Sequence, residues 1–177
     1  MKGTKSAARY AKSLLELSVE QNNSDKIAVN MQAIVNAYDE NREFQLFLNS
    51  PIISAEKKIS VFDSLFSNFE ELSAKFIRLI TKNGREAQLA DIAQVYLKLL
   101  KEQQGISEVV LTSASPLDEA TKSVILSKIK NLTKEKVELI EKTDKSLIGG
   151  FTIVMGDQKI DASIANQLNT IKQRLTK

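Results

Sequence analysis

Apolar residues recur at helical spacing through most of the first hundred residues of this chain. In one stretch they stand at i, i+4, i+7 and i+11: Ile27, Met31, Ile34 and Tyr38. This period places them on one face of an α-helix. The same spacing predicts six helices, over about 4–21, around 27–38, a short one around 44–48, one after Ser54, one around 72–80, and one over 85–104.

The predicted helices are separated by residues that stop or start helices. Ser50 precedes Pro51, and a residue before proline avoids the helical region of backbone conformation. Ser54 is expected to cap the next helix with its hydroxyl oxygen. Asn83 and Gly84 are expected to end the fifth helix, because glycine tolerates the left-handed conformation that often follows a helix.

The pattern changes after Gly105, where a β-rich stretch covers 106–113. A helix is predicted next, with Ser115 as its cap, Pro116 at its first position and Asp118 closing a capping box. The stretch 137–140 then predicts a second strand. The chain therefore changes from helical to mixed structure at this point.

The stretch 147–163 carries the most specific local pattern. Phe151, Ile153 and Met155 alternate with Thr152 and Val154, which is the period of a strand. Gly149 and Gly150 lack β-carbons just before that strand, which predicts a bulge or a close approach of another backbone segment.

A tight turn is expected at Gly156–Asp157, followed by a second short strand. Asp161 is then expected to cap a C-terminal helix. Taken together, the patterns predict a two-domain α+β protein: an N-terminal six-helix bundle over 1–104 and a small β-α-β-β-α domain over 105–177.

Composition excludes several kinds of chemistry. The chain has no cysteine and no histidine, so it lacks thiolate chemistry and the side chain best suited to proton transfer near neutral pH. Its net charge is only +3. No stretch is long and apolar enough for a membrane span, and the first residues do not form a secretory signal. We therefore expect no catalytic, cofactor-binding or metal-binding residues.

Two motifs could still be interpreted as chemistry, and both have a structural explanation. Gly149–Gly150 lacks the spacing and the lysine of a phosphate-binding loop. Asp157 and Asp161 could form a carboxylate pair, but a turn position and a helix cap explain them better.

Small residues surround Tyr10 on the first predicted helix: Ser6, Ala7, Ala8 and Ala11. Small side chains let another helix approach closely, and a tyrosine can bury its ring there while its hydroxyl is satisfied. Two interpretations stay open. The helix either crosses a neighbour closely inside the bundle, or it borders a groove for a partner's amphipathic helix.

Three stretches together resemble the ATP synthase delta subunit family, also called the oligomycin-sensitivity-conferring protein family. The first is Ala8–Lys12, and the second is Asn83–Arg85 with the apolar positions that follow it. The third runs from Asp144 to Phe151, through Gly156–Asp157, to Asp161–Ser163. They occur in order along the full chain.

The resemblance implies a non-catalytic stator subunit of a proton-translocating ATP synthase. The helical bundle would bind the N-terminal helix of an alpha subunit, and the C-terminal domain would contact the b subunits of the peripheral stalk. The protein would lie on the cytoplasmic face of a bacterial inner membrane and be associated with it only through the complex. In this family the groove lies between the first and fifth helices, which corresponds here to Tyr10, Ala11, Leu14, Phe76, Leu79 and Asn83.

Two other function classes remain as alternatives. The sequence pI of about 9.0 and the mixed C-terminal domain are compatible with a nucleic-acid-binding adaptor, whose affinity would fall steeply with salt. An enzyme with a lysine or a carboxylate pair would show a defined pocket and strongly shifted pKa values. The stator interpretation, without nucleic acid, is favoured over both.

Overall fold

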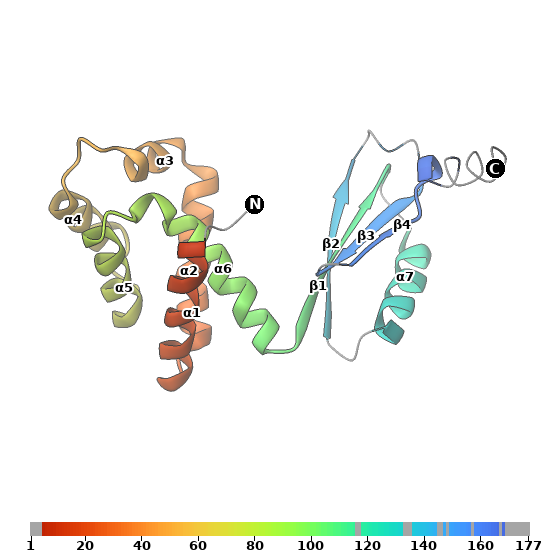
Figure 1. Cartoon of the computed structure of the whole chain (residues 1–177), viewed down its shortest axis with the longest axis horizontal. Coiled ribbons are helices and arrows are strands. Elements are labelled where there is room, and N and C mark those ends of the chain that lie inside the picture. Colours follow the sequence, from red (N-terminus) through yellow and green to blue (C-terminus); the bar gives the residue numbers. More distant parts are fainter. Residues whose placement is uncertain are drawn as a thin grey trace. The chain divides into compact units, whose positions relative to one another are not determined.

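The computed structural model describes residues 5–115, 118–132, 136–144, 147, 149–156, 158–166 and 168. This part of the chain has an α+β fold with helices first and a mixed sheet afterwards (Figure 1). It divides into two compact units, 1–101 and 102–177. We call them the helical unit and the sheet unit.

The helical unit contains six α-helices and one short 3₁₀ helix in its described residues. They are α1 Lys5–Glu20, α2 Ser24–Glu40, α3 Arg42–Asn49, α4 Ala55–Leu65, α5 Glu71–Lys82, the 3₁₀ helix η1 Glu86–Gln88, and α6 Leu89–Gln103. The predicted cap at Ser54 is confirmed, because its hydroxyl accepts a hydrogen bond from the Lys57 amide at 3.4 Å. Ser50 has the extended backbone expected before Pro51.

The end of α5 follows the prediction, but the start of the next helix differs. Gly84 has a φ of +65°, the left-handed conformation that ends a helix. The predicted helix over 85–104 begins instead with η1, and the α-helix starts only at Leu89. Tertiary contacts explain this difference, since η1 carries Glu86 to a buried lysine on α4.

The core of the helical unit is mostly aliphatic. Its fully buried apolar side chains include Ala7, Ala11, Leu14, Ile27, Met31, Ile34, Ile80, Leu89, Ile92 and Tyr96. Five phenylalanines of α3, α4 and the segment after α4 pack together as stacked and edge-on rings: Phe44, Phe47, Phe62, Phe66 and Phe69. The aromatic cluster therefore joins α3 and α4 to each other.

In its described residues, the sheet unit has four strands, with α7 packed on one face of the sheet. The elements are β1 Ile106–Ser113, α7 Glu119–Leu132, β2 Lys136–Thr143, β3 Phe151–Met155 and β4 Gln158–Asp161. The strand order is β2-β1-β3-β4, with β1 and β2 parallel and the other pairs antiparallel. The core between sheet and helix contains Val109, Leu111, Ile125, Ile129 and Ile153.

The sheet unit corrects two predictions about its elements. The order β-α-β-β-α omits one strand, because β3 and β4 both follow β2 as the two arms of a hairpin. In addition, the predicted cap at Ser115 is wrong, because α7 starts at Glu119. The Asp118 carbonyl accepts the first helical hydrogen bond, from the Lys122 amide, at 3.0 Å. Pro116 lies outside the described residues.

The backbone at Gly149 and Gly150 lies against the backbone of the residues that follow β4. The Gly149 carbonyl accepts from the Ile164 amide, and the Phe151 carbonyl accepts from the Ala162 amide, each at 3.0 Å. A β-carbon on Gly150 would overlap the carbonyl oxygen of Ala162, and the φ of Gly150 is +79°. The predicted close approach of two backbone segments is therefore confirmed.

The predicted cap of the C-terminal helix lies two residues later than expected. Asp161 is the last residue of β4, and its carboxylate accepts from the Ser163 amide at 3.0 Å in a local turn. The Ser163 hydroxyl then accepts from the Asn166 amide at 3.3 Å and caps the helical residues 164–166. Gly156 has the positive φ of the predicted turn, +56°, whereas Asp157 lies outside the described residues.

We expect Gly150→Ala to lower the free energy of unfolding by about 3 kcal/mol, because it adds a steric overlap to an unfavourable φ. Gly156→Ala is the matched control. Gly156 has a similar φ, but no atom lies within 4 Å of the added β-carbon, so about 1 kcal/mol is expected. Urea denaturation followed by circular dichroism measures both, and equal losses would contradict the close approach.

Candidate partner-binding site

Helix α5 has two different flanks. On one flank Ala74 and Ile77 border a small pocket shared with α4, and Arg78 pairs with Asp63 of α4 at 3.0 Å. The opposite flank carries a stripe at i, i+4, i+7 and i+11: Leu72, Phe76, Leu79 and Asn83. Phe76 is buried, but Leu79 is 51% exposed. This flank of α5 therefore presents apolar surface that no described element covers fully.

Helix α1 has a similar flank beside its buried face. Tyr10 is half-buried and packs against the helical core, and Leu17, two turns further, is 46% exposed. Ser6 lies one turn before Tyr10 on the same flank. We refer to this flank and the Leu72–Asn83 stripe of α5 together as the α1–α5 surface.

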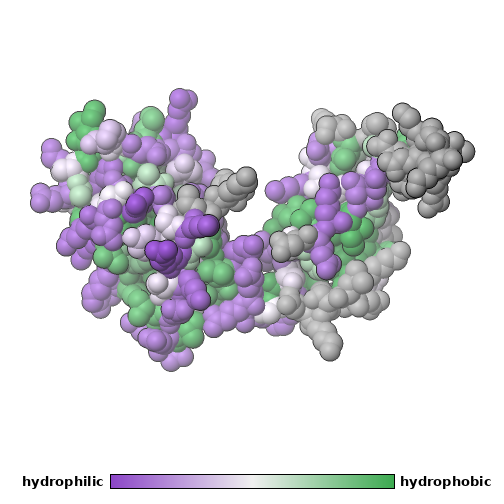
Figure 2. Space-filling view, in the orientation of Figure 1, coloured by the Kyte–Doolittle hydropathy of each residue, from purple (hydrophilic) through white to green (hydrophobic). Residues whose placement is uncertain are grey.

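The two halves of the α1–α5 surface run in opposite directions. The Ser6 hydroxyl donates to the side-chain oxygen of Gln88 at 2.7 Å, and Gln88 ends η1, which follows α5. The start of α1 is thereby tied to the segment that follows the end of α5, and both helices contact α2 (Figure 1). We infer that Tyr10 lies toward Leu79, and Leu17 toward Leu72. Figure 2 shows hydrophobic residues among hydrophilic ones on the visible face of this unit.

The predicted partner-binding residues divide into two groups. Tyr10, Leu79 and Asn83 are partly or largely exposed on the α1–α5 surface, whereas Phe76 of the same stripe is only 7% exposed. Ala11 and Leu14 are 0% exposed, so in the free chain they belong to the core beneath Tyr10 and offer no contact area. Leu17 and Leu72 were not among the predicted residues, although each stands seven residues from a predicted residue on the same flank. For the six residues that were predicted, a role in binding stays a prediction.

Buried polar contacts hold the helices that carry this surface. The Asn30 side chain of α2 donates to the Ser73 hydroxyl of α5 at 3.0 Å, and both residues are buried. The Tyr96 hydroxyl of α6 lies 2.9 Å from the Ser18 hydroxyl of α1 and donates to the Ser24 carbonyl oxygen at 3.1 Å. These contacts fix the positions of α1 and α5 relative to α2 and α6.

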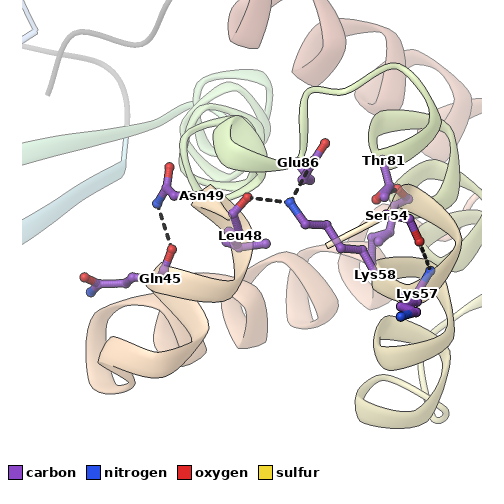
Figure 3. Close-up of polar contacts among 9 residues, drawn as sticks. Gln45, Leu48, Asn49, Ser54, Lys57, Lys58, Thr81 and Glu86 are labelled. Carbon is purple, nitrogen blue, oxygen red and sulfur yellow. Dashed lines mark hydrogen bonds and ion pairs between the residues drawn. The ribbon is translucent and has the colours of Figure 1, made fainter. Parts of the chain in front are cut away.

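A buried ion pair holds the corner between α5 and α6. Lys58 of α4 is only 1% exposed, and its ammonium donates to Glu86 of η1 at 2.8 Å and to the Leu48 carbonyl oxygen of α3 at 3.1 Å (Figure 3). Its contacts join three elements. Since η1 begins two residues after Gly84, Lys58 helps to position the end of the α1–α5 surface.

The sheet unit presents no comparable polar site in its described residues. Its shallow apolar pocket is lined by Ile129, Ile153, Met155, Gln158 and Ile160. Across the residues that the structure describes, no group of histidine, cysteine, aspartate or glutamate side chains could hold a metal ion. None of the described helices is long and apolar enough to cross a membrane.

Comparison with known proteins identifies the family. A family model described as ATP synthase delta (OSCP) subunit matches residues 7–175. The chain belongs to the ATP synthase delta (OSCP) subunit family. It is similar to ATP synthase subunit delta of Cytophaga hutchinsonii, with 34% identity over 99% of this chain and 97% of the relative. The corresponding protein of Christiangramia forsetii is 32% identical over 99% of this chain and 95% of its own.

A solved structure supports the same assignment. The fold is similar to a chain of the mitochondrial ATP synthase hexamer of Toxoplasma gondii, with a TM-score of 0.77, 26% identity and coverage of 97% of both chains. The predicted role of a non-catalytic stator component of ATP synthase is confirmed by the family assignment. The comparisons favour this role over the nucleic-acid and enzyme alternatives.

We expect Lys58→Met to lower the free energy of unfolding by about 3 kcal/mol, because it leaves the Glu86 carboxylate largely buried without its cation. Replacing the exposed neighbour, Lys57→Met, is the control and should change stability by less than about 0.5 kcal/mol. The double variant Lys58→Met/Glu86→Leu should recover most of the loss. Equal effects of the two single variants in urea denaturation would contradict the buried pair.

Burial raises the pKa of the Tyr96 hydroxyl above its usual value, against an opposing effect of the hydrogen bond with Ser18. The folded protein therefore keeps a proton that the unfolded chain releases above a pH of about 10. This stabilising contribution is complete below that pH and is lost as pH rises through the folded-state pKa. We expect urea midpoints to fall in this range, and Tyr96→Phe to make the fall shallower.

Tyr96→Phe should also cost about 1 kcal/mol at neutral pH, because the Ser24 carbonyl loses its donor. Tyr10→Phe provides the matched control, since Tyr10 is only half-buried. If wild type and Tyr96→Phe lost stability in parallel above a pH of about 10, Tyr96 would not be the group responsible for the loss.

Proposed function

We propose that this chain joins the catalytic head of ATP synthase to its peripheral stalk. In this proposal the helical unit, as a six-helix bundle, binds the N-terminal helix of an alpha subunit. The sheet unit, as the small C-terminal domain, contacts the b subunits. The protein lies on the cytoplasmic face of a bacterial inner membrane and reaches it only through the complex.

One observation carries the proposal: the α1–α5 surface leaves Leu17 and Leu79 about half exposed beside a packed core. The apolar face of an amphipathic helix matches such a surface, because its side chains project at the same i, i+3, i+4 and i+7 spacing. Covering a leucine that is half exposed contributes about 1 kcal/mol. Several such contacts, with the ring of Tyr10, can hold a helix tightly.

The mechanical role sets a requirement on this contact. Proton flow turns the rotor, and the head would turn with it unless it were held. Torque can then change the nucleotide sites of the head only if the connection outlasts many rotations. The contact must therefore dissociate slowly. Tight complexes meet this requirement, because affinity differences between related complexes reside mostly in the dissociation rate. Apolar burial provides that without depending on salt.

The contact with the stalk is assigned to the sheet unit by the family resemblance. The fold supports this assignment in one respect, because α7 packs on one face of the sheet. Val154 of β3 projects on the opposite face and is partly exposed. The unit therefore has apolar surface available for a second partner while the helical unit holds the first.

We expect Leu79→Asp and Tyr10→Asp each to weaken binding of a synthetic alpha-subunit N-terminal peptide by about tenfold or more, because each places a charge in the apolar contact. Leu46→Asp is the matched control, since Leu46 is 62% exposed on α3. Titration calorimetry gives the affinities, and circular dichroism checks folding. Unchanged affinity in both folded variants would refute the proposed binding site.

A further inference from the structure

The α1–α5 surface is electrically different at its two ends. Arg9 stands beside Tyr10 in the first half of α1, and Lys82 and Arg85 flank Asn83 at the end of α5. All three are exposed, and the ion pairs found within the described residues involve none of them. Because the start of α1 is tied to the segment after α5, these cations gather at one end of the surface.

The opposite end is acidic or neutral. Glu16 and Glu20 are exposed on the second half of α1. At the start of α5, Glu71 pairs with Lys75 at 2.6 Å, and Glu70 pairs with Lys26 of α2 at 3.2 Å. The cations of that end are therefore neutralised within the chain, whereas the two α1 carboxylates are not paired among the described residues.

We propose that this charge difference fixes the direction in which the partner helix docks. The occupant is an amphipathic helix with acidic residues toward its N-terminal end and basic residues toward its C-terminal end. Its acidic end lies at Arg9, Lys82 and Arg85, and its basic end lies at Glu16 and Glu20. The inference rests on the proposed function, in which this occupant is the N-terminal helix of an alpha subunit.

The direction follows from a general property of helices. Acidic residues are favoured in the first turn of a helix and basic residues in the last, because they complement the helix dipole. A partner with that common arrangement matches the surface when it runs parallel to α1 and antiparallel to α5. In the reverse direction, like charges meet at both ends.

Apolar contacts and charges then have different tasks. Exposed ion pairs contribute little to affinity, so the apolar residues hold the helix. Complementary charges determine orientation and speed the encounter. Mismatched charges act against the wrong orientation, which an apolar stripe alone does not exclude. This division matters for a stator, because a helix docked backwards would direct the rest of its subunit the wrong way.

The test uses the full chain and two synthetic peptides with the same leucine stripe. One peptide carries glutamates in its first two turns and lysines in its last two, and the other has these charges exchanged. In the other orientation like charges would meet at both ends, so each peptide should dock with its acidic end at Arg9, Lys82 and Arg85, and the exchanged peptide should run in the opposite direction. We expect the matched orientation to be favoured about tenfold at low salt. The double variant Arg9→Glu/Lys82→Glu should lose this preference.

The control variant is Arg42→Glu/Lys57→Glu. It makes the same charge change at exposed positions in the first turns of α3 and α4. It should keep the directional preference of each peptide. The preference should also shrink as salt is raised, because the charges are exposed. The same docking direction for both peptides on the wild-type chain would overturn the inference.

Direction can be observed directly, because the chain has no cysteine and a single one can be introduced and labelled. Ala8→Cys and Gln21→Cys place labels near the two ends of α1 without changing a charge. A fluorophore at the N-terminus of the bound acid-first peptide should transfer energy more efficiently to the label at position 8. Greater transfer to position 21 would overturn the proposed direction.

The natural alpha-subunit N-terminal peptide separates this inference from the function on which it rests. If that peptide does not bind the wild-type chain, the proposed function fails. If it binds and the charge variants and labels show no preferred direction, only the present inference fails.

Discussion

The close packing of α1 against its neighbours is the constraint on which the helical unit depends. Ala7 and Ala11 are completely buried, and their small side chains let the α1 backbone approach the rest of the core. Because the small residues occupy the face of α1 that is in close contact, the larger Tyr10 and Leu17 lie on the flank beside it. The apolar surface proposed for the partner is thus a consequence of how α1 packs, and Ala11 and Leu14 contribute to it only from below.

Buried polar groups give this packing a defined register. An aliphatic core would tolerate small shifts of one helix along another, because apolar contacts have little direction. Asn30 with Ser73 joins α2 to α5, Tyr96 joins α6 to α1 and α2, and Lys58 joins α3, α4 and η1. Each shift would leave a buried polar group without its partner, which costs more than the contact contributes. The two flanks of the α1–α5 surface are thereby kept in a fixed relation.

Sequence alone predicted the parts of this fold that depend on local interactions. The predicted helix ends are confirmed at Ser54, Pro51 and Asn83–Gly84. Capping, proline and glycine effects involve only neighbouring residues, so the sequence suffices to predict them. The prediction of an α-helix from residue 85 was wrong, because the conformation of η1 depends on a contact with Lys58, which lies far away in the sequence. Lys58 itself gave no signal, since an isolated lysine in an amphipathic helix is ordinarily exposed.

The candidate site shows the same division between local and tertiary information. Helical spacing identified the apolar residues of α1 and α5 but not how deeply each is buried. Leu14 and Leu17 look alike in the sequence, yet one is fully buried and the other is half exposed. In the sheet unit, Asp161 and Ser163 are both good capping residues, and the pairing of β4 with β3 decides between them. Such choices between equivalent residues need the fold.

A stator subunit needs a contact that is both durable and oriented, and these needs conflict if one kind of interaction must meet both. Apolar burial is durable but has little direction, whereas exposed charges have direction but little strength in salt. The α1–α5 surface separates the two by placing leucines and a tyrosine along its length and opposite charges at its ends. In the proposed complex, torque would act on the apolar contact, which exposed charges and their screening by salt affect little. In the same proposal the charges need act only once, when the partner helix first docks and its direction is selected.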